Sequence, residues 1–359
     1  MAELPATPQS LCILRLSAIG DTCHVVPLIR TLQHAWPQCR ITWIIGRTEA
    51  RLMSLLPEIE ILAIDKGKFA AEFRRLRRAL HGRRFDALLH IQLSFRASLL
   101  STLVRAPVKL GFDRARAHEL QWLFTNRRIA ARTREHVLDS FMGFADALGI
   151  AARRVEWNVP LPPDALAYAQ RLIADQRPTL LISPSSSHRM RNWRPAFYAA
   201  LADHAVNRWG MRVILCGGPT AYEIDMGARI GAAARQPLED QIGHNTLPQM
   251  LALLSRATVL VAPDTGPAHM AAVAGTPVIG LYAATNPARS GPYLSRRWCI
   301  DRFADAARRF KGSEPEDLPW GTKIEQPGVM DLIQPEEVIA RLDEFMQHGR
   351  AAGDRPVRA

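Results

Sequence analysis

The sequence from Thr258 to Tyr282 contains two short apolar runs that flank one helix-length segment. The first run, 258–261, is rich in β-branched residues and is typical of a buried strand. We expect this strand to end in the turn 263–267, because the prolines there cannot continue it. A helix is predicted over about 268–274 and the next strand over 278–282. This strand-helix-strand order predicts a parallel α/β sheet, in which ligands bind at the carboxyl edge of the strands.

The turn between this strand and this helix carries Asp264, Thr265 and Gly266, and His269 lies in the first turn of the helix. Unpaired backbone N–H groups and the positive end of the helix dipole make such a turn a natural site for a phosphate. A purely structural interpretation of these residues is also open. Asp264 or Thr265 can cap the helix, and Gly266 can simply serve the turn.

Two further strand ends in the C-terminal half carry polar residues. The predicted strand 179–182 runs into the serine-rich loop 183–187. The strand that ends at Cys216 leads into the glycine turn 217–218, with Glu223 in the next helix. Because these loops and the turn described above would share one edge of one sheet, together they predict a nucleotide pocket.

The N-terminal half opens with a similar pattern. The strand Leu11–Leu16 leads into the turn 17–22, and a helix with Pro27 in its first turn is predicted over 25–35. This order is that of a Rossmann-type half. Further strands are predicted over 41–45, 59–64 and 87–93.

The turn 17–22 contains a single glycine. It lacks Gly-x-Gly-x-x-Gly, and no Gly-x-x-x-x-Gly-Lys-Ser/Thr occurs in the chain, so neither a dinucleotide site nor a P-loop is predicted. The turn instead presents a carboxylate, Asp21, at the carboxyl edge of the strand. Asp21 can act in a site at this edge or can cap the helix, and both interpretations stay open.

At 359 residues the chain is long enough for two domains, each with its own core. The proline-rich stretch 159–163 marks the boundary, and we expect domains over 1–160 and 161–333. An amphipathic closing helix is predicted over 334–348 and a disordered tail over 349–359.

The net charge of +12 predicts an anionic partner: a phosphorylated substrate, a membrane surface or nucleic acid. The arginine-rich helical stretch 73–84 can be a merely solvated face or a docking surface for an anionic membrane. No RRM, KH or zinc pattern supports nucleic-acid binding. We expect a cytoplasmic protein without a structural metal, because no signal peptide or membrane span is visible and the five cysteines are scattered.

Two segments together resemble a known family. Leu14-Arg-Leu-Ser-Ala-Ile-Gly-Asp21 and Asp264-Thr-Gly-Pro-Ala-His269 resemble the two signatures of the lipopolysaccharide heptosyltransferases of glycosyltransferase family 9, which adopt the GT-B fold. The matching order runs over nearly the whole chain and includes Ile41-Thr-Trp43, Arg191-Asn-Trp193, Gly217-Gly218 and Met330-Asp-Leu-Ile333. The N-terminal pattern is similar to the heptosyltransferase I branch. The stretch 310–328 departs from the family pattern.

The resemblance implies two Rossmann-like domains that face each other across a cleft. The N-terminal domain would bind a Kdo-lipid A type acceptor, and the C-terminal domain would bind ADP-L-glycero-D-manno-heptose. The implied reaction is an inverting glycosyl transfer without metal or cofactor, and the sequence contains no Asp-x-Asp motif. The implied place is the inner face of the inner membrane, on its anionic surface and without nucleic acid as a partner.

The resemblance also assigns residues to roles. Asp21 matches the catalytic carboxylate, the general base for the acceptor hydroxyl. Arg191 stands where close relatives carry lysine, which keeps the charge but changes the geometry. His136 is a plausible acceptor ligand, although a structural histidine is the alternative. The donor-binding set carried over is Ser186, Ser187, Arg191, Glu223, Asn245, Asp264, Thr265, Gly266 and His269. The acceptor-binding set is Ser17, Gly20, Lys66, Arg114, Arg116, His118 and His136.

Other functions are compatible with parts of this pattern. A GT-B-like enzyme could epimerise or hydrolyse a sugar nucleotide, or transfer another sugar to a different glycolipid, because a fold does not fix chemistry. A nucleic-acid-binding protein would explain the charge but not the polar loops on one sheet edge. A two-lobed solute-binding protein is not expected without a signal peptide.

Overall fold

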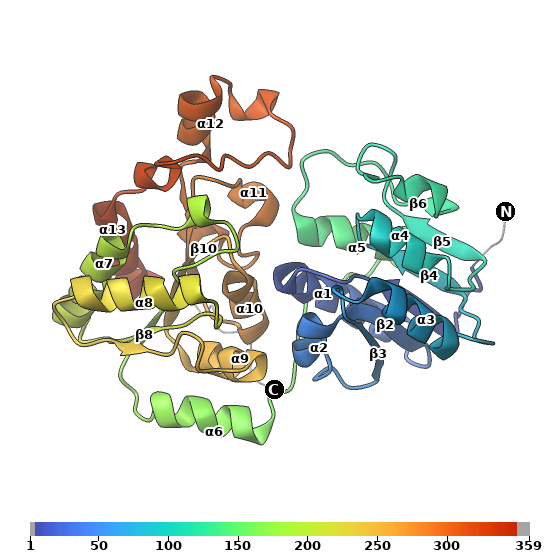
Figure 1. Cartoon of the computed structure of the whole chain (residues 1–359), viewed down its shortest axis with the longest axis horizontal. Helices are drawn as coiled ribbons and strands as arrows, with labels where there is room; N and C mark the ends of the chain where they lie inside the picture. The colour runs from blue at the N-terminus through green and yellow to red at the C-terminus, as the bar shows by residue number, and fades with distance from the viewer. Residues whose placement is uncertain (1–3, 350–359) are drawn as a thin grey trace. The chain divides into compact units, whose positions relative to one another are not determined.

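The computed structural model of the protein describes residues 4–349 (Figure 1). The chain divides into two compact units, Met1–Pro160 and Leu161–Ala359. Each unit is built on a six-stranded sheet in which all neighbouring strands pair in parallel. The α/β fold with a Rossmann-like arrangement in each half is therefore confirmed.

The sheet of the N-terminal unit has the strand order β3-β2-β1-β4-β5-β6. Cys12 and Leu14 of β1 lie in a core formed with α3 and α4. Leu11 and Ile13 alternate with them along the strand and are also fully buried, so both faces of the sheet are covered. The strands are β1 (Ser10–Leu14), β2 (Arg40–Gly46), β3 (Ile59–Ile64), β4 (Ala87–His90), β5 (Val108–Gly111) and β6 (Arg127–Arg128). The helices are α1 (Ile19–Ala35), α2 (Arg47–Met53), α3 (Phe69–Ala79), α4 (Phe95–Ser101) and α5 (Val137–Ala147), and a 3-10 turn, η1, spans Gln121–Leu123.

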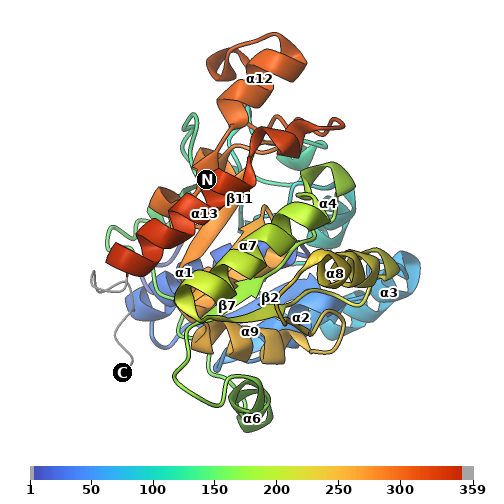
Figure 2. The same ribbon diagram turned by 90° about the vertical axis from the view of Figure 1, so that its left-hand side faces the viewer.

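The sheet of the C-terminal unit has the order β12-β11-β10-β7-β8-β9. One face packs on α7, α8, α12 and α13 around Tyr198 and Leu201, and Figure 2 shows α7 beside α13. Helix α9 packs against both α6 and α10. The strands are β7 (Thr179–Ile182), β8 (Arg212–Leu215), β9 (Glu239–Asp240), β10 (Val259–Pro263), β11 (Val278–Tyr282) and β12 (Ile300–Asp301). The helices are α6 (Pro163–Leu172), α7 (Pro195–Trp209), α8 (Ala221–Ala233), α9 (Leu247–Arg256), α10 (Gly266–Ala274), α11 (Pro287–Ser290), α12 (Phe303–Lys311) and α13 (Pro335–Glu344), with the 3-10 turn η2 at Arg189–Arg191.

The two sheets share a topological feature that positions the candidate site. In each, the strand order reverses between the first and the fourth strand of the unit, β1 beside β4 and β7 beside β10. The connections that leave these two strands diverge to opposite sides, which opens a crevice at their carboxyl ends. The loop with Asp21 follows β1, and the turn 264–266 follows β10, so both signature segments lie at such a switch point.

Three sequence predictions about elements were wrong in detail. Helix α1 begins at Ile19, so Pro27 lies in its interior and not in its first turn. The helix tolerates the missing N–H because the residues from Thr22 to Leu32 are largely buried, and packing outweighs one lost hydrogen bond. Strand β10 extends through Pro263, which pairs with Leu281 at the strand's end.

The predicted closing helix ends earlier than expected. Helix α13 stops at Glu344, and a π-helical turn, Phe345–Gly349, follows. Val338, Leu342 and Phe345 belong to the core of the C-terminal unit. The predicted disordered tail lies outside the described residues, apart from Gly349. Within residues 4–349, no helix combines the length and the apolar character that a membrane crossing requires.

Candidate active site

Asp21 lies in the first turn of α1, just beyond the carboxyl end of β1. Its Oδ2 forms an ion pair with the Arg15 guanidinium and accepts a hydrogen bond from the Ala18 N–H at 3.2 Å. Among residues 4–349 nothing bonds Oδ1, and the side chain keeps 32% of its surface exposed. Ala18 holds the N-cap position, and Asp21 takes part in capping as the third helical residue, because its side chain accepts from the Ala18 N–H. One oxygen of Asp21 is fixed by the protein, and the other is open to a ligand.

Arg15 is the anchor of this carboxylate. It is buried, donates from a terminal nitrogen to the Ile91 carbonyl at 2.8 Å, and lies 5.2 Å from the centre of the Phe141 ring. The Arg15 carbonyl accepts from the Trp43 indole N–H at 3.2 Å. These contacts hold the guanidinium in one place, so the orientation of Asp21 is fixed before any substrate arrives.

The loop in front of α1 is held by a buried polar network. Gln92 Oε1 accepts from the N–H groups of Leu16 and Ser17, at 3.1 and 3.3 Å. Gln121 Nε2 donates to the His90 carbonyl at 2.8 Å and lies 3.3 Å from the His90 ring. Burial, with a smaller effect from Lys109, lowers the pKa of His90 to about 3. The imidazole is therefore neutral at ordinary pH and serves as a hydrogen-bonding scaffold.

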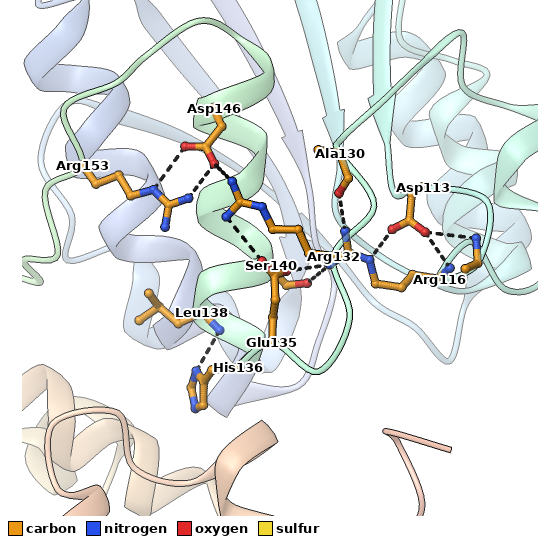
Figure 3. Close-up of polar contacts among 11 residues, drawn as sticks. Asp113, Arg116, Ala130, Arg132, Glu135, His136, Leu138, Ser140, Asp146 and Arg153 are labelled. Atoms are coloured by element: carbon orange, nitrogen blue, oxygen red, sulfur yellow. Dashed lines mark hydrogen bonds and ion pairs between the residues drawn. The ribbon is translucent and has the colours of Figure 1, made fainter. Parts of the chain in front are cut away.

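Arg116, in the loop 113–135, forms several bonds within the protein that the sequence did not predict (Figure 3). Its guanidinium pairs with Asp113 and Glu135 and donates to Ser140 and to the Ala130 carbonyl. All of these partners come from the protein itself, so Arg116 ties the loop to α5. The role of Arg116 in acceptor binding stays a prediction, and an acceptor anion would have to compete with these contacts for the guanidinium.

His136 and Lys66 are likewise engaged by the protein. The His136 ring is buried and caps α5, accepting from the Leu138 N–H at 3.1 Å. Lys66 Nζ lies 3.0 Å from Glu49 Oε1. His136 thus has a structural contact here, and its role as an acceptor ligand stays a prediction.

Two of the remaining acceptor candidates are exposed to solvent. Arg114 and His118 are exposed on the loop after β5, and the Arg114 guanidinium lies 5.1 Å from the centre of the Trp122 ring. Ser17 is half-buried and Gly20 is buried, and both lie beside Asp21 in the turn after β1.

In the C-terminal unit, the turn after β10 shows which of its residues caps helix α10. The sequence had left this open between Asp264 and Thr265. Thr265 is the N-cap of α10, and its hydroxyl accepts from the Ala268 N–H at 3.4 Å. Asp264 does not cap the helix: Ser290 donates to its Oδ2 at 3.2 Å, and His269 Nε2 lies 3.5 Å from its Oδ1. Within the described part of the chain, the N–H groups of Thr265 and Gly266 donate no hydrogen bond.

The charge of Asp264 is stabilised by its surroundings. Burial raises the pKa of this carboxyl, but the hydrogen bond and charge of His269, with the charge of Arg191, outweigh burial and lower it below the usual value. Arg191 therefore acts electrostatically on the turn after β10, although it belongs to the loop after β7. The structure brings together Asp264, His269 and Arg191, as the prediction of one pocket requires.

The loop after β7 has its own internal bonds. Asn192 Oδ1 accepts from the Ser186 N–H at 2.7 Å, and the Ser186 hydroxyl donates to the His188 carbonyl at 3.0 Å. Ser187 is exposed. Arg191 is bound to Glu325, a residue that no sequence argument had placed here.

Glu223 and Asn245 support neighbouring loops. Glu223 accepts from the Gly218 N–H at 2.8 Å and from the Thr220 hydroxyl at 2.6 Å, so both of its oxygens hold the turn after β8. Asn245 donates to the Gln241 carbonyl at 3.1 Å.

Comparison with known proteins decides the family. The sequence model described as glycosyltransferase family 9 (heptosyltransferase) matches residues 73–317. The chain is 39% identical to the lipopolysaccharide core heptosyltransferase OpsX of Haemophilus influenzae, over 94% of this chain and 97% of that protein. The chain belongs to glycosyltransferase family 9.

Solved structures of this family share the fold. A family 9 glycosyltransferase of Veillonella parvula matches with a TM-score of 0.79 at 19% identity, over 96% of this chain and 99% of that one. The Escherichia coli heptosyltransferase WaaC, solved with ADP, matches with a TM-score of 0.72 at 20% identity, over 93% and 99%. The GT-B assignment made from the two signatures is therefore confirmed.

Sequence reasoning missed the residues that hold the family 9 signature side chains in place. Arg15 was visible inside the first signature as a charged residue in an apolar strand, which is a signal for a buried partner. Gln92 follows β4, the strand beside β1. Its contact with the loop after β1 could have been predicted, because loops that leave neighbouring parallel strands at a switch point lie close together. Ser290 and Glu325 carried no local signal, because each contacts its partner across a long stretch of chain.

The buried His90 predicts an acid sensitivity of the N-terminal unit. Above its ordinary pKa of 6.5, the histidine is neutral in both folded and unfolded chains. As the pH falls from 6.5 toward 3, only the unfolded chain binds the proton, so the free energy of unfolding decreases. We expect His90→Gln to flatten this decrease by up to about 1 kcal/mol per pH unit, measured by urea denaturation between pH 7 and pH 4.5. Parallel curves for the two proteins would contradict this.

Proposed function

We propose that this family 9 enzyme transfers L-glycero-D-manno-heptose from ADP-heptose to a Kdo-containing acceptor of the lipopolysaccharide inner core. The transfer would invert the anomeric carbon and use no metal ion. The observation that carries the proposal is the 39% identity to a lipopolysaccharide core heptosyltransferase over nearly the whole of both chains. The position of both signature segments at switch points of their sheets supports it.

Asp21 is the proposed general base. In an inverting transfer, the acceptor hydroxyl loses its proton as its oxygen attacks the anomeric carbon, on the face opposite the leaving diphosphate. A carboxylate is suited to this task when the protein holds one of its oxygens in place and leaves the other accessible to the substrate. Arg15 and the Ala18 N–H hold Oδ2, and Oδ1 would accept the proton.

The turn after β10 and the loop after β7 form the proposed donor subsite. The departing ADP gains negative charge as the glycosidic bond breaks, so it must meet positive groups and N–H donors there. Arg191, in the loop after β7, would supply the positive charge, and the N–H groups of Thr265 and Gly266, at the N-terminus of α10, would supply the donors. Asp264, ionised and bonded by Ser290, would accept hydrogen bonds from the heptose hydroxyls.

The acceptor is proposed to contact the exposed cations of the N-terminal unit. Kdo carboxylates and lipid A phosphates are anions, and Arg114 and His118 are accessible to them. Arg116 and His136 would act indirectly, by holding the loop 113–135 that carries these side chains. In this proposal, fewer residues of the acceptor-binding set contact the substrate than the family resemblance implies.

Helix α3 is the proposed contact with an anionic membrane surface. Its Leu76 is buried, whereas Arg74, Arg77 and Arg78 are exposed. Arg75 is paired with Glu72 and does not add to this surface. A lipid-linked acceptor resides in such a membrane, so a basic helix face would hold the enzyme near its substrate.

The first test concerns the base. Asp21→Asn keeps an oxygen that can accept from the Ala18 N–H, so the helix start is preserved while the proton acceptor is lost. We expect kcat to fall by roughly two to four orders of magnitude, with ADP affinity unchanged. Product formation is measured by mass spectrometry with ADP-heptose and a Kdo-lipid A acceptor. Full activity in this variant would reduce Asp21 to a structural residue, and free heptose without acceptor product would indicate a hydrolase.

The second test concerns the donor. In a thermal-shift panel of ADP-sugars and UDP-sugars, ADP-heptose should raise the melting temperature most, because a ligand that binds only the folded state stabilises it. Arg191→Ala should weaken ADP binding by roughly 10- to 100-fold in calorimetry, since it removes charge-assisted hydrogen bonds. A larger shift with a UDP-sugar, or unchanged ADP affinity in the variant, would count against this donor site.

The third test concerns the membrane. Arg77→Glu combined with Arg78→Glu should weaken binding to vesicles containing anionic phospholipid by roughly 30-fold or more in cosedimentation, because each basic residue near the surface contributes about 1 kcal/mol. The matched control is Arg208→Glu with Arg229→Glu, which makes the same charge change on α7 and α8. Equal losses in both double variants would show that net charge, and not α3, determines binding.

A further inference from the structure

Glu325 lies in the stretch 310–328, the part of the chain that departs from the family pattern. Its position is fixed by the preceding residue: the Ile324 N–H donates to the Ala284 carbonyl at 2.8 Å, and the Ile324 side chain is fully buried in the core of the C-terminal unit. Ala284 follows β11, so Glu325 is delivered to the carboxyl edge of the sheet, where the donor subsite is proposed.

The Glu325 carboxylate sits between two basic side chains of the loop after β7. Its Oε1 accepts from Arg191 Nε at 2.7 Å and from a terminal nitrogen of Arg191 at 2.5 Å. Its Oε2 lies 3.6 Å from His188 Nε2. Arg191 is only 13% exposed and Glu325 24%, so water screens this pair less than it screens a surface ion pair.

This arrangement places a protein carboxylate on the nitrogens that a phosphate would use. Nε and a terminal nitrogen of Arg191 both bond Oε1 of Glu325, and an N–H that donates to this carboxylate cannot at the same time donate to a phosphate. Asp264 adds a second negative charge near Arg191. An incoming diphosphate would therefore meet an arginine that is already neutralised.

We propose that Glu325 is a built-in competitor for the donor's diphosphate, which holds Arg191 when no donor is bound and must be displaced when the diphosphate binds. This inference rests on the proposed donor site and adds a determinant of donor affinity within it. The carboxylate selects for ligands with enough negative charge to take Arg191 from it, such as a nucleoside diphosphate. Glu325 acts through Arg191 and is a positioning residue.

The electrostatics of Glu325 agree with an exchange of partners. Burial raises the pKa of this carboxyl, but the hydrogen bond and charge of Arg191, with smaller effects of His188 and Lys323, lower it below the usual value. When a phosphate takes Arg191, the carboxylate loses this stabilisation and gains an anionic neighbour, so its affinity for a proton increases. Donor binding and proton uptake by Glu325 are then coupled.

The test is the ADP affinity of Glu325→Gln, measured by calorimetry. Glutamine keeps the shape but removes the charge, and we expect ADP to bind roughly 3- to 30-fold more tightly than to the wild type. Glu325→Ala should show the same direction of change. The matched control is Glu314→Gln, which removes one charge from the same stretch, where Glu314 pairs with Arg308 instead. The control should leave ADP affinity unchanged.

A double variant isolates the route of the effect. In the Arg191→Ala background, Glu325→Gln should give little further gain, because the contested cation is gone. Equal or weaker ADP binding by Glu325→Gln in an enzyme whose wild type binds ADP would overturn the inference and leave the proposed function standing. The same gain in Glu314→Gln would overturn it as well. Absence of ADP binding in every protein would refute the donor site and the inference with it.

Discussion

The parallel pairing of the strands is the constraint on which the rest of this structure depends. Because all strands of a sheet run the same way, every loop that leaves a carboxyl end emerges at one edge, and the reversal of strand order opens a crevice there. The same order occurs in both units, and each signature segment lies at a switch point: the first follows β1, the first strand of its unit, and the second follows β10, the fourth strand of its unit. The chemistry of each site is then decided by the side chains that the neighbouring loops bring to that edge.

In this strongly basic protein, several arginines near the candidate sites form ion pairs with acids of the same unit. The net charge of +12 predicts open cationic surfaces, yet several of the candidate cations are neutralised by acids of their own unit. Arg15 holds Asp21, Arg116 holds Asp113 and Glu135, and Arg191 holds Glu325. The arginines near the sites therefore serve first to orient carboxylates and loops. An anionic substrate gains such a cation only by replacing the acid that already binds it.

The sequence predicted the elements where hydrophobic pattern and turn residues agree. The strands 59–64, 179–182 and 278–282 have the predicted bounds. The start of α1 was missed, because Ala18 is no typical N-cap and Pro27 suggested a later first turn. Side-chain roles were harder to predict than elements. Pairing between Arg191 and Glu325, 134 positions apart, leaves no trace in local composition, and nor does the engagement of Arg116 by Ala130 and Ser140.

Whether a ligand can bind an arginine of this protein depends on how many protein groups already bond that arginine and on how firmly those groups are held. Arg116 bonds two acids, a hydroxyl and a carbonyl, and its acids are only 9% and 14% exposed. An anion would have to break all of these contacts together, which a network of this kind resists. Among the described residues, Arg191 forms an ion pair with one acid, Glu325, which is more exposed at 24% and is carried by a segment without regular structure. Exchange of partners is therefore easier in the loop after β7 than in the loop 113–135, and this difference supports the proposed anion capture by Arg191 and the proposed loop support by Arg116.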